Sequence, residues 1–101
     1  MSWLPSNRPP THPGAMLREE FLEPLGLSQA EVARAIGVPY QRFNEVVRGA
    51  RGVTPSTALR LARYFGNSAQ FWLNLQSAYD LWHASRQEVD ALREIAPLQA
   101  A

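Results

Sequence analysis

Residues 28–47 constrain the fold more than any other segment, because their spacing predicts two short helices joined by a tight turn. Ser28 and Glu31 have the spacing of a capping box, which marks a helix start. Gly37 supplies the turn with a residue that tolerates a positive φ. Ala33 provides a small side chain where two steeply crossing helices approach each other. The apolar residues expected to hold the two helices together are Ile36, Val38, Phe43 and Val46.

The same helical periodicity continues on both sides of this motif, and no segment alternates as a strand would. Proline suits a first helical position, and glycine ends a helix well. The expected helices are residues 13–22, closed by Pro24 and Gly26; 28–36; 39–48; 54–65, closed by Gly66; and 68–82, with a weak further turn or two at Val89, Leu92 and Ile95. We therefore predict an all-α fold, with five helices in one compact bundle that contains a helix-turn-helix.

Length and composition limit the chain to one modest domain. It has 101 residues, of which 46% are hydrophobic, and it contains no cysteine, which excludes disulfides and cysteine zinc sites and suits a reducing compartment. We find no apolar run of about 18 residues and no leader-like start, so we expect a cytoplasmic protein without a membrane helix. The expected organisation is an extended arm over 1–12, a helix-turn-helix domain over 13–85 and a partly helical tail over 86–101.

Positive charge concentrates on the predicted helix-turn-helix although the net charge is only +1. Residues 28–63 contain six arginines and two glutamates, whereas the segments before and after are each slightly acidic. All ten basic residues are arginine, which favours bidentate contact with phosphate or guanine. A GC-rich coding sequence would produce the same bias, so the placement of the charge is more informative than its type.

The polar face of the predicted 39–48 helix is the candidate binding surface. A helix fits the major groove of DNA, where glutamine and asparagine can pair with adenine and arginine with guanine. Phosphate contacts are expected from the basic loop after this helix and from the start of the preceding helix. The residues expected to contact double-stranded DNA are Gln29, Tyr40, Gln41, Arg42, Asn44, Arg48 and Arg51. Glu45 is expected to orient an arginine, and the alternative is that the whole face is polar only because it is solvated.

An aromatic stripe on the last predicted helix has two interpretations. Trp72, Leu75, Tyr79 and Trp82 recur at helical spacing and are first of all candidates for the core. Because the band is wide for so small a domain, part of it, with the C-terminal tail, is a candidate homodimer interface. Two recognition helices about 34 Å apart could then recognise a palindromic site.

Catalytic and metal chemistry have little support in this chain. His12 and His83 are far apart and lack accompanying cysteines, and the three glutamates near residue 20 suit a solvated helix face. There is no glycine-rich phosphate loop. We expect no enzyme activity, no cofactor and no metal.

Three stretches of the chain resemble HigA-type antitoxins, within the phage-repressor-like, xenobiotic-response-element class of helix-turn-helix proteins. They are Arg8–Gly14, Leu17–Gly26, and Thr54–Pro55 through Phe71–Gln76 to Tyr79–Trp82. The resemblance implies an antitoxin of a type II toxin–antitoxin system that represses its own operon and neutralises a small mRNA-cleaving HigB-type toxin. It also implies association with the nucleoid while operator is bound. Pro39 departs from the class, which often has a serine or threonine at this position, and so makes a phosphate contact from it doubtful.

Two other functions remain open on the sequence. One is a stand-alone repressor without a toxin, and the other is a protein-interaction module that has lost DNA binding. A neighbouring reading frame for a basic protein of about 90 residues would favour the antitoxin. Its toxin could bind the arm around Trp3 and Leu4 with the first helix, or the C-terminal tail, and the sequence does not choose between them.

Overall fold

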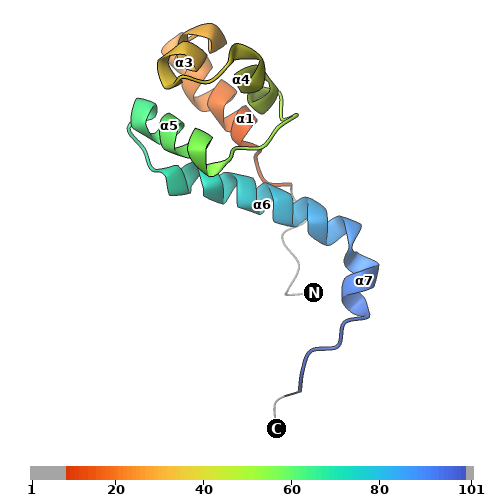
Figure 1. Cartoon of the computed structure of the whole chain (residues 1–101). Coiled ribbons are helices and arrows are strands. Elements are labelled where there is room, and N and C mark those ends of the chain that lie inside the picture. The colour runs from red at the N-terminus through yellow and green to blue at the C-terminus, as the bar shows by residue number, and fades with distance from the viewer. Residues whose placement is uncertain (1–8, 100–101) are drawn as a thin grey trace.

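The computed structural model describes residues 9–99, and all secondary structure in that range is helical (Figure 1). The first three elements follow one another without a break and form one rod, so residues 9–99 contain six helices. The elements are α1 (Pro13–Met16), the π-helical turn η1 (Leu17–Leu22), α2 (Glu23–Leu25), α3 (Gln29–Ile36), α4 (Tyr40–Val47), α5 (Pro55–Phe65), α6 (Ala69–Gln87) and α7 (Val89–Arg93). The predicted all-α class is confirmed. Most of the predicted arm, including Trp3 and Leu4, lies outside the described residues.

Local capping signals account for the helix-turn-helix boundaries. The Ser28 hydroxyl accepts a hydrogen bond from the Glu31 amide (3.1 Å), and the Glu31 carboxylate accepts one from the Ser28 amide (3.3 Å). These bonds satisfy amides that the first turn of α3 leaves unpaired. Gly37 ends α3 in the left-handed region, at φ 71°. The capping box and the glycine turn are therefore confirmed.

The first helix does not stop before Pro24, as the sequence predicted, but continues to Leu25. A proline inside a regular α-helix clashes with the carbonyl group four residues earlier. Here the preceding turn, η1, is π-helical, with the Glu23 amide bonded to the Arg18 carbonyl. This wider turn gives the proline ring room, and Gly26, at φ 65°, then ends the rod.

Helices α1 to α5 and the first half of α6 surround a single core. Its largest fully buried side chains include Trp72 and Phe43, and Trp72 donates from Nε1 to the Asn67 side chain (2.9 Å). Leu59 lies 63% exposed, on the outer face of α5, whereas its neighbour Ala58 is buried. The core hydrophobic residues are Leu17, Leu22, Val32, Ala33, Ile36, Val38, Phe43, Val46, Val47, Val53, Ala58, Leu61, Ala62 and Trp72.

The rod beginning at α1 packs against the C-terminal end of α4 at Gly14. A Cβ atom built on Gly14 would collide with the Val46 carbonyl oxygen and would lie 2.6 Å from that of Val47. Only glycine permits this approach of two backbones. Gly14 therefore sets the position of α4 relative to the first rod.

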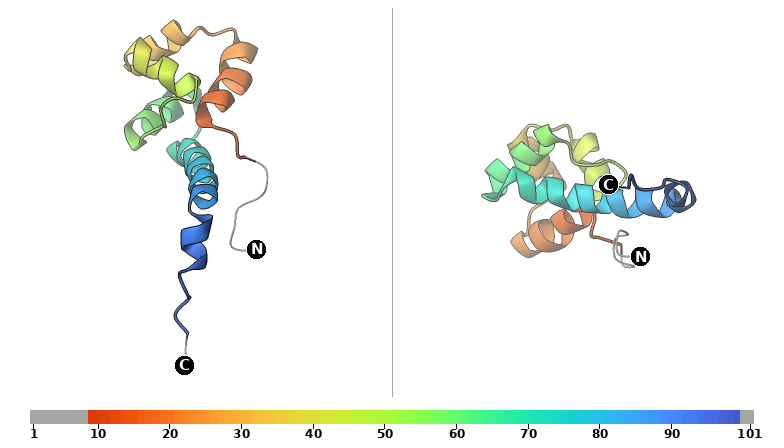
Figure 2. Two further views of the ribbon diagram at one scale, coloured as in Figure 1. Left: turned by 90° about the vertical axis from the view of Figure 1, so that its right-hand side faces the viewer. Right: turned by 90° about the horizontal axis from the view of Figure 1, so that it is seen from below.

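The C-terminal half of α6 leaves the bundle and projects from it (Figure 2). We call residues 13–77 the head and residues 78–93 the stalk. No described residue after Trp72 is buried, and the molecule measures 56 × 24 × 22 Å. The expected compact bundle is thus the head, while α6 runs on to Gln87, past the predicted domain boundary at residue 85. None of the described helices is long and apolar enough to cross a membrane.

Candidate nucleic-acid interface

Helix α4 presents one apolar face to the core and one polar face to solvent. Phe43, Val46 and Val47 are buried beneath it. The first turn on the other side carries Tyr40, Gln41 and Arg42, all exposed, with Tyr40 54% accessible. This division agrees with the predicted orientation of α4. The first turn thus offers an aromatic ring, an amide and a guanidinium group to a ligand outside the protein.

A hydrogen-bond chain links the start of α3 to the end of α4. Asn44 donates from Nδ2 to Oε1 of Gln29 (2.9 Å), and its Oδ1 accepts from Nε of Arg48 (2.9 Å). Three residues predicted to contact DNA are thereby brought together along one edge of the motif. The bonds hold Arg48 in a defined direction at the C-terminal end of α4.

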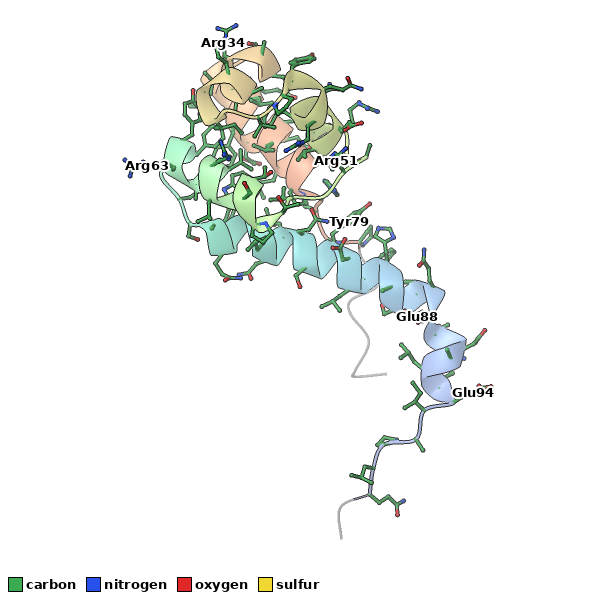
Figure 3. All side chains as sticks on the ribbon, viewed as in Figure 1. Arg34, Arg51, Arg63, Tyr79, Glu88 and Glu94 are labelled. Carbon is green, nitrogen blue, oxygen red and sulfur yellow. The ribbon has the colours of Figure 1, made fainter. Side chains whose placement is uncertain are left out.

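The loop after α4 is held by Glu45. Its carboxylate accepts from Nε of Arg51 (3.0 Å), and its carbonyl oxygen accepts from the amides of Ala50 (2.8 Å) and Arg51 (3.2 Å). The predicted role of Glu45, to orient an arginine, is confirmed. The Arg51 side chain remains half exposed and lies at the edge of the head beside this loop (Figure 3).

Pro39 stands at the N-cap of α4 and makes no side-chain capping bond. The other long helices of the head are capped by hydroxyl groups, those of Ser28, Thr54 and Ser68. A cap without a donor or acceptor gives no phosphate contact from its side chain.

The remaining arginines of the basic segment have other environments. Arg60 donates from Nη1 to the Ile36 carbonyl (2.8 Å) and so satisfies the C-terminal end of α3. Its guanidinium group has an intramolecular role. Arg34 and Arg63 are exposed, and Arg63 lies on the opposite side of the head from Arg51 (Figure 3).

His12 caps the start of α1, and its contact with α6 is one that the sequence did not reveal. Its Nδ1 accepts from the Gly14 amide (2.9 Å), and its ring meets the Tyr79 ring edge-on with centroids 4.7 Å apart. Burial lowers the pKa of His12 below its ordinary value of 6.5, and the nearby Asp80 carboxylate opposes this shift. His12 thus ties the start of α1 to α6. Its position directly before Pro13 is a local signal of a helix start, but nothing local indicates the contact with Tyr79.

The aromatic stripe on α6 divides between the core and the surface. Trp72 is fully buried within its own chain and presents no surface to a second copy. Leu75 is half buried and packs on the core, and Tyr79 contacts His12. Trp82 is half buried beneath the guanidinium group of Arg86, 4.6 Å from the ring centroid. Trp72 is therefore a core residue and not an interface residue. Leu75, Tyr79 and Trp82 remain predicted interface residues.

The most exposed apolar side chains of the C-terminal region are ones that the stripe did not include. Leu81 on the stalk is 61% exposed, and Ile95 and Leu98 beyond it are 67% and 98% exposed. Leu81 lies next to the predicted stripe in the sequence but is not one of its members. Among residues 9–99, no three His, Asp or Glu side chains cluster as metal ligands would.

Comparison with known proteins agrees with this geometry. Residues 18–72 match the helix-turn-helix family. The chain is 53% identical over 90 residues to virulence-associated protein I of Dichelobacter nodosus, covering 89% of this chain and 82% of that protein. The structure of PA4674 from Pseudomonas aeruginosa in complex with its 18-bp operator DNA has a TM-score of 0.87 at 46% identity, covering 94% of this chain and all of that one.

The fold and the exposed face of α4 define a helix-turn-helix protein. A second solved structure, Pseudomonas aeruginosa antitoxin HigA with the higBA promoter, is 46% identical, with a TM-score of 0.85 over 89% of this chain and 99% of that one. The chain belongs to the HigA-type antitoxins.

Proposed function

We propose that this protein binds the operator of its own operon through α4 and represses transcription from it. The observation that carries the proposal is the exposed first turn of α4, on a helix whose other face is fixed in the core. Side chains in the first turn of such a helix can reach base edges in the major groove. Gln41 and Arg42 have the donor and acceptor groups for adenine and guanine.

Phosphate contacts come from the residues around this turn. Arg48 and Arg51 are held beside α4 by Asn44 and Glu45, respectively, and Gln29 lies at the exposed N-terminus of α3. Contacts to phosphate orient a protein on the duplex, and contacts to bases select the sequence. We assign Arg48, Arg51 and Gln29 to the first task and Tyr40, Gln41 and Arg42 to the second.

We further propose that the protein acts as a homodimer and neutralises a small mRNA-cleaving toxin of the HigB type. The exposed apolar residues Leu81, Ile95 and Leu98 support a protein contact along the stalk and tail. A dimer would place two α4 helices on one face, and two half-sites about 34 Å apart make a palindromic operator.

Fluorescence anisotropy with a labelled duplex from the region upstream of the gene tests DNA binding. We expect tight binding to this duplex and weaker, salt-sensitive binding to a scrambled duplex of equal length. Equal affinity for both duplexes would contradict sequence-specific repression. If the protein binds neither duplex at low salt, with or without the neighbouring gene product, the remaining function is that of a protein-interaction module.

Co-expression with the adjacent reading frame tests the antitoxin role. If that frame encodes a small basic protein that arrests growth, this chain should restore growth and co-purify with it. A promoter-binding chain without such a neighbour would instead be a stand-alone repressor. A toxic neighbour that this chain neither binds nor neutralises would contradict the toxin proposal while leaving repression intact.

A further inference from the structure

The basic loop between α4 and α5, residues 48–54, rests on α6 at its far end. The Val53 amide donates a hydrogen bond to Oε1 of Gln76, over a distance of 2.8 Å. Val53 is buried and belongs to the core, and the bond from its amide is part-buried, a setting in which backbone donors are normally paired. Gln76 therefore satisfies a backbone group that the loop itself leaves unpaired.

The Gln76 amide group is fixed on both of its polar atoms. Its Nε2 donates to Oδ1 of Asp80, one turn further along α6, at 3.0 Å. This second bond directs the amide oxygen toward the loop. Gly52 lies directly on the same group, since a Cβ atom built there would be 3.0 Å from Cδ of Gln76. The loop thus packs against the face of the amide as well as bonding to its oxygen.

The near end of the loop is held by α4. The Glu45 carbonyl and carboxylate bind the amides of Ala50 and Arg51 and the Arg51 side chain. Arg51 consequently stands on a segment fixed at one end by Glu45 and at the other, two residues later, by Gln76. These bonds order the loop in the free protein. Without them, the loop would have to be ordered when DNA binds, and the lost conformational entropy would weaken binding.

We propose that Gln76 is a positioning residue for DNA binding, which holds the Arg51 loop against the head so that the guanidinium group meets a phosphate without reordering. The inference rests on the proposed DNA-binding function. Gln76 acts through the loop, since both polar atoms of its amide are already bonded within the protein. Through Gln76, α6 is in direct contact with the loop that carries Arg51.

The variant Gln76→Met removes both hydrogen bonds at similar side-chain length. Gln70→Met is its matched control, because Gln70 is on the same helix and donates to Asn74 (2.8 Å) in an exposed pair. Hydrogen exchange of the Val53 amide in the free protein measures the bond itself. We expect exchange to accelerate about 2- to 10-fold in Gln76→Met and to stay unchanged in Gln70→Met.

Operator binding measures the consequence. We expect Gln76→Met to weaken binding about 2- to 10-fold and to reduce the slope of log K against log salt by up to about one unit, as loss of one phosphate contact would. Arg51→Ala should show the same slope change, and the double variant should lose no more than Arg51→Ala alone. A purely structural role would give additive losses and an unchanged slope.

Several results would overturn the inference. Unchanged affinity and slope in Gln76→Met, or losses that add in the double variant, would show that the loop needs no support from α6. If Gln76→Met unfolds, Gln76→Glu is the alternative variant, because it keeps an oxygen for the Val53 amide and loses only the bond to Asp80. In Gln76→Glu the Val53 amide should exchange faster than in the wild-type protein but more slowly than an unprotected amide. A wild-type protein that binds no duplex would refute the DNA-binding function, whereas unaltered Val53 exchange in Gln76→Met would refute the Gln76 contact alone.

Discussion

Asn44 of α4 and Gln29 of α3 are joined side chain to side chain across the turn, with Nδ2 of Asn44 2.9 Å from Oε1 of Gln29. The same Asn44 amide accepts from Arg48. A residue that could pair with adenine is thus engaged on both atoms inside the protein, where it aligns the two helices and one arginine. Asn44 therefore acts first as an organiser of the surface in the free protein.

Removing this link should weaken operator binding more than it weakens the fold. For Gln29→Ala we expect about 2- to 10-fold lower operator affinity, which is the range of one lost hydrogen bond, and little change in the thermal midpoint. Anisotropy titrations of Gln29→Ala, Asn44→Ala and the double variant would show losses that are less than additive. Strictly additive losses would mean that each residue contacts DNA separately.

Arg42 should determine base choice at one operator position. Arg42→Ala is expected to cost about 1–3 kcal/mol on the cognate site and to relax the preference at a single base pair. Arg63→Ala is the control, because it removes the same charge from a position away from α4 (Figure 3). Binding to a panel of single-base operator variants measures the effect. Uniform weakening on every sequence would show that Arg42 contacts phosphate.

Gly14 should be intolerant of any side chain. A methyl group there meets the backbone carbonyls of Val46 and Val47, which cannot move without displacing the end of α4. We expect Gly14→Ala to lower the free energy of unfolding by about 1–3 kcal/mol and also to reduce operator affinity. Gly26→Ala is strained by its positive φ but meets no atom within 4 Å, so it should reduce stability while leaving affinity unchanged. Denaturant unfolding and anisotropy separate the two outcomes.

His12 should make the protein less stable as the pH falls. Burial lowers its folded-state pKa below 6.5, so the unfolded chain binds more protons in the window beneath that value. Its contribution is complete above about pH 6.5 and is lost as the pH falls toward the folded-state pKa. His12→Asn keeps a capping oxygen for Gly14 and should flatten this part of the profile. Chemical denaturation between about pH 5.5 and 7.5 measures it, and an unchanged profile would contradict the role of His12.

The stalk should carry the dimer contact. Leu81→Lys and Trp82→Ala are expected to raise the dimer dissociation constant at least about tenfold, the size of a modest interface contact, without loss of helix. Trp72→Ala should instead unfold the head, with a loss of about 3–5 kcal/mol. Sedimentation velocity over a concentration series measures loss of the dimer, and circular dichroism measures loss of helix. A dimer that survives both stalk variants would place the interface elsewhere.

Much of the helical framework was predictable because its signals are local. The cap at Ser28 and the left-handed glycines at 37 and 66 act within about four residues of their own position. The exception was Pro24, where the rule for a regular α-helix failed because η1 has a wider turn. The division of α6 between head and stalk was also missed, since an apolar stripe is equally consistent with a core and with an exposed face.

Apart from the end of the first rod, the sequence by itself determined where α3, α4 and α5 begin and end and which face of α4 is polar, because these depend on neighbours within one or two turns. The tertiary structure decided which aromatic side chains are buried, how far α6 projects, and which residues support the basic loop. Gln76 bonds Val53 across 23 residues and Asn44 bonds Gln29 across 15. Such pairs form only after helices distant in the chain have packed, and no local pattern specifies them.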